Sequence, residues 1–344
     1  MKGSRQDMQK PTAIDLFSGC GGLTLGLKYA GYNVLGAVEV APKAQQTYKM
    51  NHPEVRLYES DIRDISTSTI LADTGINYGD LDLLAGCPPC QGFSRLRTRN
   101  RLNSVDDPRN DLILQFQRYV EELLPKNVMM ENVPALAKDP RFKQLISHLE
   151  SLGYNTIFEV ADAANFGVAQ RRKRLILLAS RVGVPKLAEK SKKRLFVRDV
   201  ISHIDAPTVS SDVIHTIPEK RSDAVKRLIA LIPKDGGSRA QLPLEYQLAC
   251  HLRSDGFRDV YGRMAWDDVS PTITSGCINP SKGRFLHPEE NRTITLREAS
   301  LLQGFPVEYR FDATHGKEAI ALMIGNALPP PFIMAHALAL RAQK

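Results

Sequence analysis

The chain has 344 residues, of which 42% are hydrophobic and 24% charged, and its formal net charge is +8. These values exclude wholesale disorder and allow one large domain with a smaller one beside it. The chain begins with a polar segment, no apolar run reaches transmembrane length, and the five cysteines are an odd, sparse set for a disulfide framework. We therefore expect a cytoplasmic protein with no membrane partner.

The first half of the chain alternates short apolar segments with helical patterns. It predicts strands at 13–17, 34–38, 81–85, 128–130, 155–160 and 174–179, and helices at about 111–124 and 142–152. Strands that alternate with helices indicate an α/β fold with a doubly wound, mostly parallel sheet. Ligands of such sheets bind at the carboxyl ends of the strands.

This alternation ends after residue 180. Residues 181–290 carry scattered proline and glycine, and 181–263 hold 16 Lys and Arg against 10 Asp and Glu. Such a segment predicts a smaller, irregular domain whose basic surface is either a solvated face or a contact for a polyanion. Helices follow at 296–302 and 331–340. We expect a first domain at 1–180, a second domain at 181–311, and C-terminal helices at 312–344 that return to the first.

A glycine-rich turn, from Phe17 to Gly22, follows the first predicted strand. Glycines at this place let the backbone approach a ligand at a helix N-terminus. Glu39 comes 20 residues after Gly19, where an acidic residue binds ribose hydroxyls in nucleotide-type sites. Because Thr24 stands where a dinucleotide fingerprint needs glycine, another adenosyl cofactor is favoured over NAD. A tight turn without a ligand is the alternative.

Cys87 and Cys90 enclose two prolines directly after the third predicted strand. Their C-x-x-C spacing occurs in redox and zinc sites, but no further metal ligands stand nearby, and the residues that follow indicate a loop. A single nucleophilic thiolate fits better, and we favour Cys90 because Cys87 lies closer to the strand. Arginines alternate after this loop and form either a solvated surface or a basic flap that closes on phosphates: Arg95, Arg97, Arg99 and Arg101.

Two further patterns place acid and base groups near the same sheet edge. Glu131 ends a buried strand, where it is either a surface group or a partly desolvated acid that protonates a ring nitrogen. The segment from Gln170 to Arg174 is either an ordinary charge run or a functional motif. Alternation along a strand would point Arg172 and Arg174 to one face, where they could hold a carbonyl and a carboxylate.

Together these segments resemble the cytosine-5 DNA methyltransferases, of the bacterial restriction-modification type, over nearly the whole chain. The segment from Asp15 to Gly22 is similar to the family's cofactor loop, and that from Pro89 to Gln91 to its catalytic tripeptide. The acid motif and the Q-x-R-x-R motif are matched by Glu131–Val133 and Gln170–Arg174. Two later blocks resemble the one after the recognition region and the motif that returns to the cofactor pocket, Arg297–Pro306 and Gly325–Pro329.

The resemblance implies an enzyme that flips a cytosine out of double-stranded DNA and methylates it within a short specific sequence. Cys90 would attack carbon 6, Glu131 would protonate or hydrogen-bond ring nitrogen 3, and Arg172 and Arg174 would hold the base carbonyl and the acid. The residues implied to bind S-adenosylmethionine, whose product is S-adenosylhomocysteine, are Phe17, Gly19, Gly21, Glu39, Val40, Asp61, Ile62, Pro89, Asn326 and Ala327. DNA contacts are implied for Gln91, Ser94, Arg95, Arg97 and Arg99. No metal is implied.

The resemblance also implies that residues 1–180 are a catalytic and cofactor-binding domain and that residues 181–311 are a target-recognition domain with a hinge. We expect the stretch 266–276 to be that hinge, with plain packing as the alternative. The DNA site is not readable from this segment. A monomer is expected, with a cognate restriction endonuclease as a functional partner.

Three other functions compete with this prediction. An RNA cytosine-5 methyltransferase would use the same motifs, but the Cys-Phe-Thr tripeptide of the transfer-RNA branch is absent. A binding module that has lost catalysis would lack Cys90 or Glu131, and the sequence has both. A redox protein using Cys87 and Cys90 would leave the other motifs to coincidence.

Overall fold

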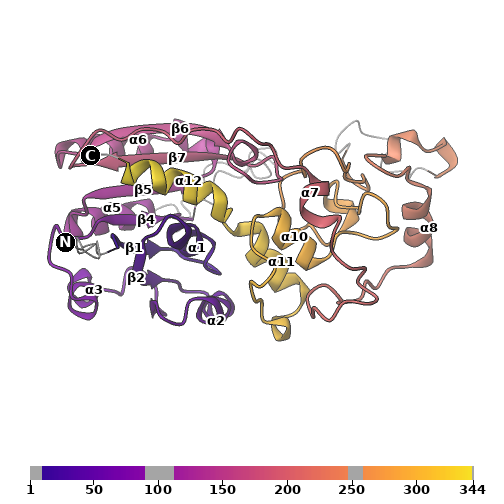
Figure 1. The fold of residues 1–344 in the computed structure, drawn as a ribbon, viewed down its shortest axis with the longest axis horizontal. Helices are drawn as coiled ribbons and strands as arrows, with labels where there is room; N and C mark the ends of the chain where they lie inside the picture. Colours follow the sequence, from indigo (N-terminus) through magenta and orange to yellow (C-terminus); the bar gives the residue numbers. More distant parts are fainter. Residues whose placement is uncertain (1–9, 90–111, 247–258, 343–344) are drawn as a thin grey trace, which may run out of the picture.

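Figure 1 shows the computed structural model, which describes residues 10–89, 112–246 and 259–342. A seven-stranded sheet occupies one end of the elongated molecule, with the strand order β3-β2-β1-β4-β5-β7-β6. Irregular segments and short helices form the other end. The predicted α/β fold is confirmed.

Five strands of the sheet run parallel to one another: β1 (Thr12–Leu16), β2 (Asn33–Val38), β3 (Arg56–Tyr58), β4 (Leu83–Gly86) and β5 (Asn127–Asn132). β6 (Asn155–Asp162) and β7 (Lys173–Ser180) pair antiparallel, and β7 also pairs antiparallel with β5. The sheet is therefore mostly parallel, as expected. Because the parallel strands end at one edge, the residues that follow β1, β2, β4 and β5 gather there.

Helices cover both faces of the sheet, as expected of a doubly wound fold. α3 (Thr67–Thr74), α5 (Leu112–Leu123) and α6 (Pro140–Ser151) contribute to the core on one face. The core on the other face includes residues of α1 (Gly22–Tyr29), α2 (Pro42–Asn51) and α12 (Pro330–Arg341). Strand alternation divides β5 between these cores, since Val128 and Met130 face the first and Met129 the second.

Several elements carried too weak a pattern to be predicted. β3 has only three residues, and α2 is polar at most positions. α3 was also missed, whereas α11 (Lys317–Asn326) falls within the C-terminal helices expected at 312–344. α12 is the predicted C-terminal helix extended by one residue at each end, and it packs along α1 on the sheet (Figure 1).

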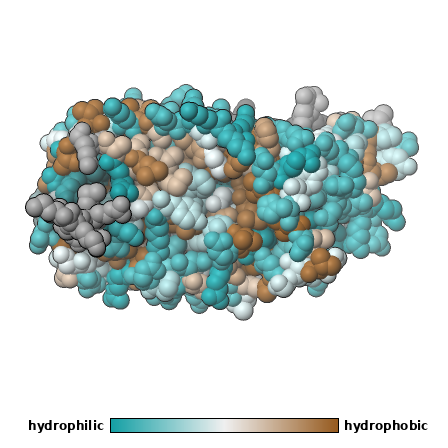
Figure 2. Space-filling model, in the orientation of Figure 1, coloured by the Kyte–Doolittle hydropathy of each residue, from teal (hydrophilic) through white to brown (hydrophobic). Residues whose placement is uncertain are grey.

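The part beside the sheet holds α7 (Val197–Ile201), α8 (Asp223–Leu231), α10 (Leu296–Leu302) and α11, joined by irregular chain and short 3-10 turns. Its core includes Ile273, Leu302 and Phe305, and it also takes in Cys20 and Ala169 from the sheet side. The two parts therefore share one apolar core. The face seen in Figure 2 is mostly hydrophilic, with hydrophobic patches mainly near its middle.

One stretch within the described residues, Lys317–Arg341, has the length and apolar character to cross a membrane. It consists of α11 and α12, and 67% of its apolar window is buried inside the protein. Burial of this kind is what a core helix pair shows, because its apolar surface is already covered by the sheet and by α1.

Candidate functional site

The predicted nucleophile Cys90 lies outside the described residues, as do Gln91, Ser94, Arg95, Arg97 and Arg99. Pro89, the last described residue before them, is half-buried. The segment leading to it is tied to the neighbouring strand, because Nδ2 of Asn132 donates to the carbonyl oxygen of Pro88 at 2.9 Å. Pro88, two residues before Cys90, therefore lies beside the end of β5.

Glu131 is the best-defined group of the site. It lies near the end of β5 with 1% of its surface exposed. Its Oε1 forms an ion pair with Nε of Arg174 at 2.9 Å, and its Oε2 accepts a hydrogen bond from the Cys87 thiol, also at 2.9 Å. Burial raises the pKa of Glu131, and the opposing effects of Arg174, Cys87 and Arg172 do not cancel the rise. Such a carboxyl group keeps its proton closer to neutral pH, which suits a general acid.

The two arginines of the Gln170–Arg174 segment have different targets. Arg174 faces Glu131 and forms an ion pair with its Oε1. Among the described residues, no donor makes a hydrogen bond of good geometry to Oε1, so this oxygen can still accept one. Arg172 is 2% exposed and donates to three backbone carbonyls, at 3.0–3.2 Å: Ile273, Gly325 and Ala327. Burial lowers the pKa of Arg172 to about 9. Its expected contact with a base carbonyl stays a prediction.

The glycine-rich turn after β1 has a backbone that few residues can adopt. Phe17, Gly19 and Gly21 have positive φ angles of 63°, 56° and 97°. Nothing lies within 4 Å of a Cβ built on Gly19, so the space above it is open to a ligand. Oε2 of Glu39 accepts from the backbone N–H of Gly19 at 2.7 Å, and its Oε1 accepts from that of Ala41 at 2.7 Å.

These two hydrogen bonds hold the Glu39 carboxylate at the end of β2. Burial raises its pKa, and the donations from the backbone of Ala41, Gly19 and Val40 oppose that rise. Each carboxylate oxygen keeps a second lone pair, so Glu39 can still accept from ribose hydroxyls. The turn and Glu39 thus fit an adenosyl group, and the structure brings them together.

The other residues expected to bind the cofactor differ widely in how exposed they are. Val40 is 60% exposed, whereas Ile62 is 3% exposed and packs in the core on one face of the sheet. Oδ1 of Asp61 accepts from the backbone N–H of Arg63 at 3.0 Å. At the end of α11, Asn326 is exposed and Ala327 is half-buried. Their contacts with a cofactor stay predictions.

His52 and Tyr309 support the glycine-rich turn, and no sequence pattern indicated them. Nε2 of His52 lies 3.2 Å from the carbonyl oxygen of Gly21 and 3.1 Å from the Tyr309 hydroxyl, which in turn donates to the carbonyl of Cys20. Lys28 can only donate to Nδ1 of His52, so Nε2 carries the proton. A Cβ on Gly21 would lie 2.5 Å from His52 Nε2, so this close approach requires glycine.

A second buried network begins in β1. Thr24 donates to Oδ2 of Asp15 at 2.6 Å and contacts the Tyr48 hydroxyl at 2.8 Å, and all three residues are fully buried. Oδ1 of Asp15 has no hydrogen-bond partner among the described residues. Burial raises the pKa of Asp15 to about 7, although Thr24 opposes the rise. Asp15 opens the segment that resembles the cofactor loop, but the pattern gave no sign of this network.

The predicted hinge runs alongside the Gln170–Arg174 segment. The backbones of Ser270 and Ala169 pair at 2.9 Å, and Ser270 also accepts from the backbone N–H of Arg171 at 2.9 Å. Gln170 is fully buried; its Oε1 accepts from the Ile273 N–H at 3.0 Å and its Nε2 donates to Gln303 at 2.6 Å. This stretch connects the sheet part with the rest of the chain.

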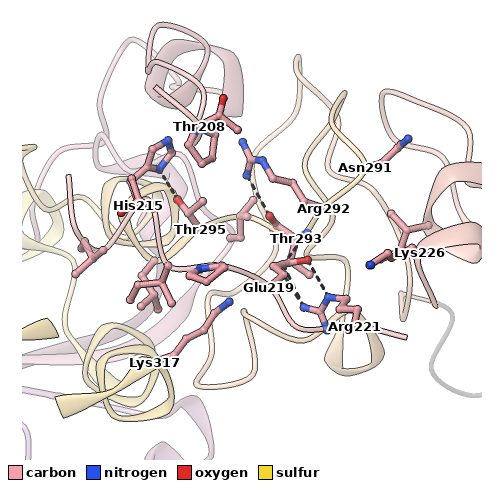
Figure 3. Close-up of a pocket in the computed structure, with 18 residues that line it drawn as sticks. Thr208, His215, Glu219, Arg221, Lys226, Asn291, Arg292, Thr293, Thr295 and Lys317 are labelled. Atoms are coloured by element: carbon pink, nitrogen blue, oxygen red, sulfur yellow. Dashed lines mark hydrogen bonds and ion pairs between the residues drawn. The ribbon is translucent and has the colours of Figure 1, made fainter. Parts of the chain in front are cut away.

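A cavity of about 410 Å³ lies in the part beside the sheet (Figure 3). Its charged side chains are largely paired, since Arg221 binds Glu219 at 2.8 Å, as Figure 3 shows. Arg292 binds Glu298, which lies outside the cavity lining, at 2.7 Å. None of the predicted site residues lines it. The reactive groups of the described chain instead gather at the sheet edge. No group of three or more His, Cys, Asp or Glu side chains within residues 10–89, 112–246 and 259–342 could hold a metal ion.

Comparisons with known proteins agree with this geometry. The family described as C-5 cytosine-specific DNA methylase matches residues 12–342. The chain is 36% identical over 332 residues to a type II methylase, M.HgiDII, of Herpetosiphon aurantiacus, covering 92% of this chain and 91% of that protein. It is 31% identical to the type II methyltransferase M1.HphI of Haemophilus parahaemolyticus, covering 95% and 85%. Its fold is similar to that of a methyltransferase of Entamoeba histolytica, with a TM-score of 0.67 at 16% identity and coverage of 96% and 98%.

Proposed function

The chain belongs to the C-5 cytosine-specific DNA methylase family and is a DNA (cytosine-5) methyltransferase, and on this premise we propose how its residues carry the reaction. Cys90 is the nucleophile, Glu131 is the general acid, and Arg174 holds the acid. One observation carries the proposal: a buried carboxyl group with a raised pKa lies at the carboxyl edge of the sheet, beside the segment that leads to Cys90.

In the proposed cycle, the Cys90 thiolate forms a bond to carbon 6 of a flipped cytosine while ring nitrogen 3 takes the proton of Glu131. Electron density moves to carbon 5, which receives the methyl group that S-adenosylmethionine supplies. The carbon 5 proton then passes to solvent while the bond between Cys90 and carbon 6 breaks, and the nitrogen 3 proton returns to the carboxylate of Glu131, so both groups are restored. After the first step, the ion pair with Arg174 at 2.9 Å stabilises the carboxylate left on Glu131.

The cofactor pocket is proposed to lie over the glycine-rich turn. Gly19 leaves open space for a ligand, and Glu39 is held at the end of β2 with lone pairs free for ribose hydroxyls. The further contacts of this pocket are proposed for Phe17, Gly21, Val40, Asp61, Ile62, Pro89, Asn326 and Ala327. The strained backbone at Phe17 supports a ligand here, because such strain is commonly kept where it serves a site.

The substrate is proposed to be double-stranded DNA, read within a short sequence. The recognition domain is assigned to residues 181–311, with the basic excess of 181–263 available for phosphates and base edges. Gln91, Ser94, Arg95, Arg97 and Arg99 are proposed to contact DNA beside the flipped base. The proposed boundary at residue 180 is supported by the end of β7 at Ser180, and the proposed return of the C-terminal helices to the first domain is supported by the packing of α12 on α1.

The biological setting is proposed from the relatives. Two of them are named as type II enzymes, which fits a role beside a cognate restriction endonuclease. A cytoplasmic monomer that uses no metal ion and binds no membrane is consistent with this role.

Bisulfite sequencing of plasmid DNA tests the proposal. Cells that express the wild-type chain are expected to protect cytosines in one short recurring context. The matched Cys90→Ser variant should leave those cytosines unprotected while it still binds S-adenosylhomocysteine. Protection that persists in Cys90→Ser would exclude Cys90 as the nucleophile, and no protection by a folded, cofactor-binding wild type would contradict DNA as the substrate.

A further inference from the structure

Cys87 occupies a place that its strand determines. β4 and β5 pair in parallel with Gly86 opposite Met130, so the next residues, Cys87 and Glu131, emerge side by side. The backbone N–H of Cys87 donates to the carbonyl oxygen of Leu16 at 3.3 Å, which keeps this residue aligned with the sheet. Its Sγ then lies 2.9 Å from Oε2 of Glu131.

We propose that Cys87 is a positioning residue for methyl transfer: its thiol donates a hydrogen bond to Oε2 of Glu131 and holds that carboxyl group for the target base. This inference rests on the proposed role of Glu131. It also gives the two cysteines of the Cys87–Cys90 segment different tasks, since a thiol that donates its hydrogen to a carboxylate is not the group that attacks carbon 6.

The groups that face the Glu131 carboxyl explain why this donor matters. Arg174 contacts Oε1, and Arg172 acts from further away because its guanidinium is bonded to backbone carbonyls. With Arg174 on one oxygen and Cys87 on the other, the carboxyl group is held from two sides. A hydrogen bond to the ionised form favours that form, so the thiol limits how far burial raises the pKa of Glu131.

The thiol also leaves room for substrate. A carboxyl oxygen has two lone-pair positions, so Oε2 can accept from the thiol at one of them and use the other for the proton that passes to ring nitrogen 3. A thiol is a weak donor, so its loss should slow methyl transfer at pH 7 by only about two- to tenfold, the range of one ordinary hydrogen bond.

Substitution of Cys87 separates this role from simple packing. Cys87→Ala removes the donor, and Cys87→Ser keeps a donor at the same position. Carbon-13 NMR of glutamate-labelled protein, without DNA or cofactor, would follow the ionisation of Glu131, with Glu131→Gln to assign its signal. We expect the pKa of Glu131 to rise in Cys87→Ala and to return toward the wild-type value in Cys87→Ser. Cys87→Val replaces Cys87→Ala if that variant fails to fold.

The pH profile of single-turnover methylation of plasmid DNA is the second readout. The limb of the pH profile that is lost in Glu131→Gln reports the ionisation of Glu131. This limb should move to higher pH in Cys87→Ala. Adding Cys87→Ala to Glu131→Gln should not change the rate further. Equal titration of Glu131 in Cys87→Ala and the wild type would overturn the inference. Because the titration needs no turnover, an inactive wild type would count against the proposed function alone.

Discussion

At the scale of single residues, burial decides the chemistry of this protein more than charge pairing does. Glu131 and Asp15 are both fully buried, and burial is the largest influence on each of them. Glu131 has a cation and a thiol on its two oxygens, whereas Asp15 has only Thr24. The acid nearest the proposed chemistry is therefore stabilised on both sides, while Asp15 has one oxygen without a partner.

Glu131→Gln keeps the size of this side chain but removes its exchangeable proton. We expect methyl transfer to slow by about 100-fold or more, as for a lost general acid. Rapid-quench single-turnover assays would measure this step apart from product release. Glu189→Gln, an exposed position in the loop after β7, is the matched control and should leave the rate unchanged. A Glu131→Gln rate within a few-fold of wild type would remove Glu131 from the mechanism.

Asp15 gives a prediction about stability and pH. Its folded-state pKa of about 7 lies above the ordinary aspartate value of 3.8, so between these values the folded protein binds more protons than the unfolded chain. Stability from this group is therefore present at low pH and falls as pH rises toward 7. Asp15→Asn should gain stability over the wild type by on the order of 3 kcal/mol between pH 4 and 7.

Urea unfolding at several pH values would measure this difference. His52 and His336, whose pKa values burial lowers to about 4, act in the opposite direction but equally in both proteins. A difference between Asp15→Asn and wild type that does not change with pH would show that Asp15 titrates normally.

At the scale of elements, the turn between β1 and α1 depends on side chains from elsewhere. α1 begins at Gly22 without a side-chain cap, and Gly21 before it has a positive φ. Tyr309, which follows α10, and His52, which follows α2, hold the carbonyls of Cys20 and Gly21. The glycine-rich turn is thus positioned by one side chain from the sheet part and by one from the part of the chain beside the sheet.

Tyr309→Phe removes this support while keeping the ring. We expect the dissociation constant of S-adenosylhomocysteine to rise by about three- to tenfold, corresponding to one lost hydrogen bond, with little change in the rate of the chemical step. Isothermal titration calorimetry and single-turnover assays would separate the two effects. Tyr78→Phe, at a side chain that is 60% exposed, is the control. Unchanged affinity in Tyr309→Phe would show that the turn holds its shape alone.

At the scale of the whole molecule, the segment 169–174 joins the sheet to the rest of the chain. Gln170 connects to Gln303 and Ile273, and Arg172 connects to Ile273 and to two carbonyls at the end of α11. Both side chains are almost fully buried. This segment is therefore one of several junctions between the two parts, beside the apolar core that they share and the contacts of Tyr309 with the glycine-rich turn. It lies close to Glu131, which forms an ion pair with Arg174 of the same segment.

Neighbouring arginines allow a direct test of this junction. Arg172→Met removes the side-chain donor to the carbonyls of Ile273 and Gly325, whereas the carbonyl of Ala327 keeps its hydrogen bond from Gln303. We expect the change to destabilise the protein by on the order of 2–5 kcal/mol. Arg171 is half-exposed and forms a surface ion pair with Asp268 at 3.0 Å, so Arg171→Met should cost less than about 1 kcal/mol. Chemical denaturation of both variants would measure this contrast, and equal losses would contradict it.

The charge of the whole chain leads to a prediction about DNA. With a net charge of +8 and a basic excess in 181–263, binding should release counterions from phosphates. We expect the dissociation constant for a DNA duplex to rise at least about tenfold between 50 and 200 mM salt. Fluorescence anisotropy over this range would measure the slope. Affinity that is independent of salt would contradict phosphate contacts by the basic segment.

Much of the fold follows from local sequence because the pattern repeats. Apolar strands such as 34–38 and 174–179 and the amphipathic α5 are marked by their own residues, so their positions agree within one or two residues. Glu39 and Glu131 were predictable because each ends a strand, and parallel strands bring their ends together. β3 and α2 were missed because three residues or a polar helix carry no apolar period.

By itself, the sequence determined the α/β fold, the edge at which the site lies, and the family to which the chain belongs, because strand periodicity and short motifs are local properties. Only the tertiary structure decided which groups meet across long distances in the chain. It bonded the guanidinium of Arg172 to backbone carbonyls, and it placed Tyr309 and His52 against the glycine-rich turn. It also set the thiol of Cys87 against Glu131. Such contacts depend on strand register and on how distant segments of the chain pack together. The burial that results then sets the pKa values of the side chains involved.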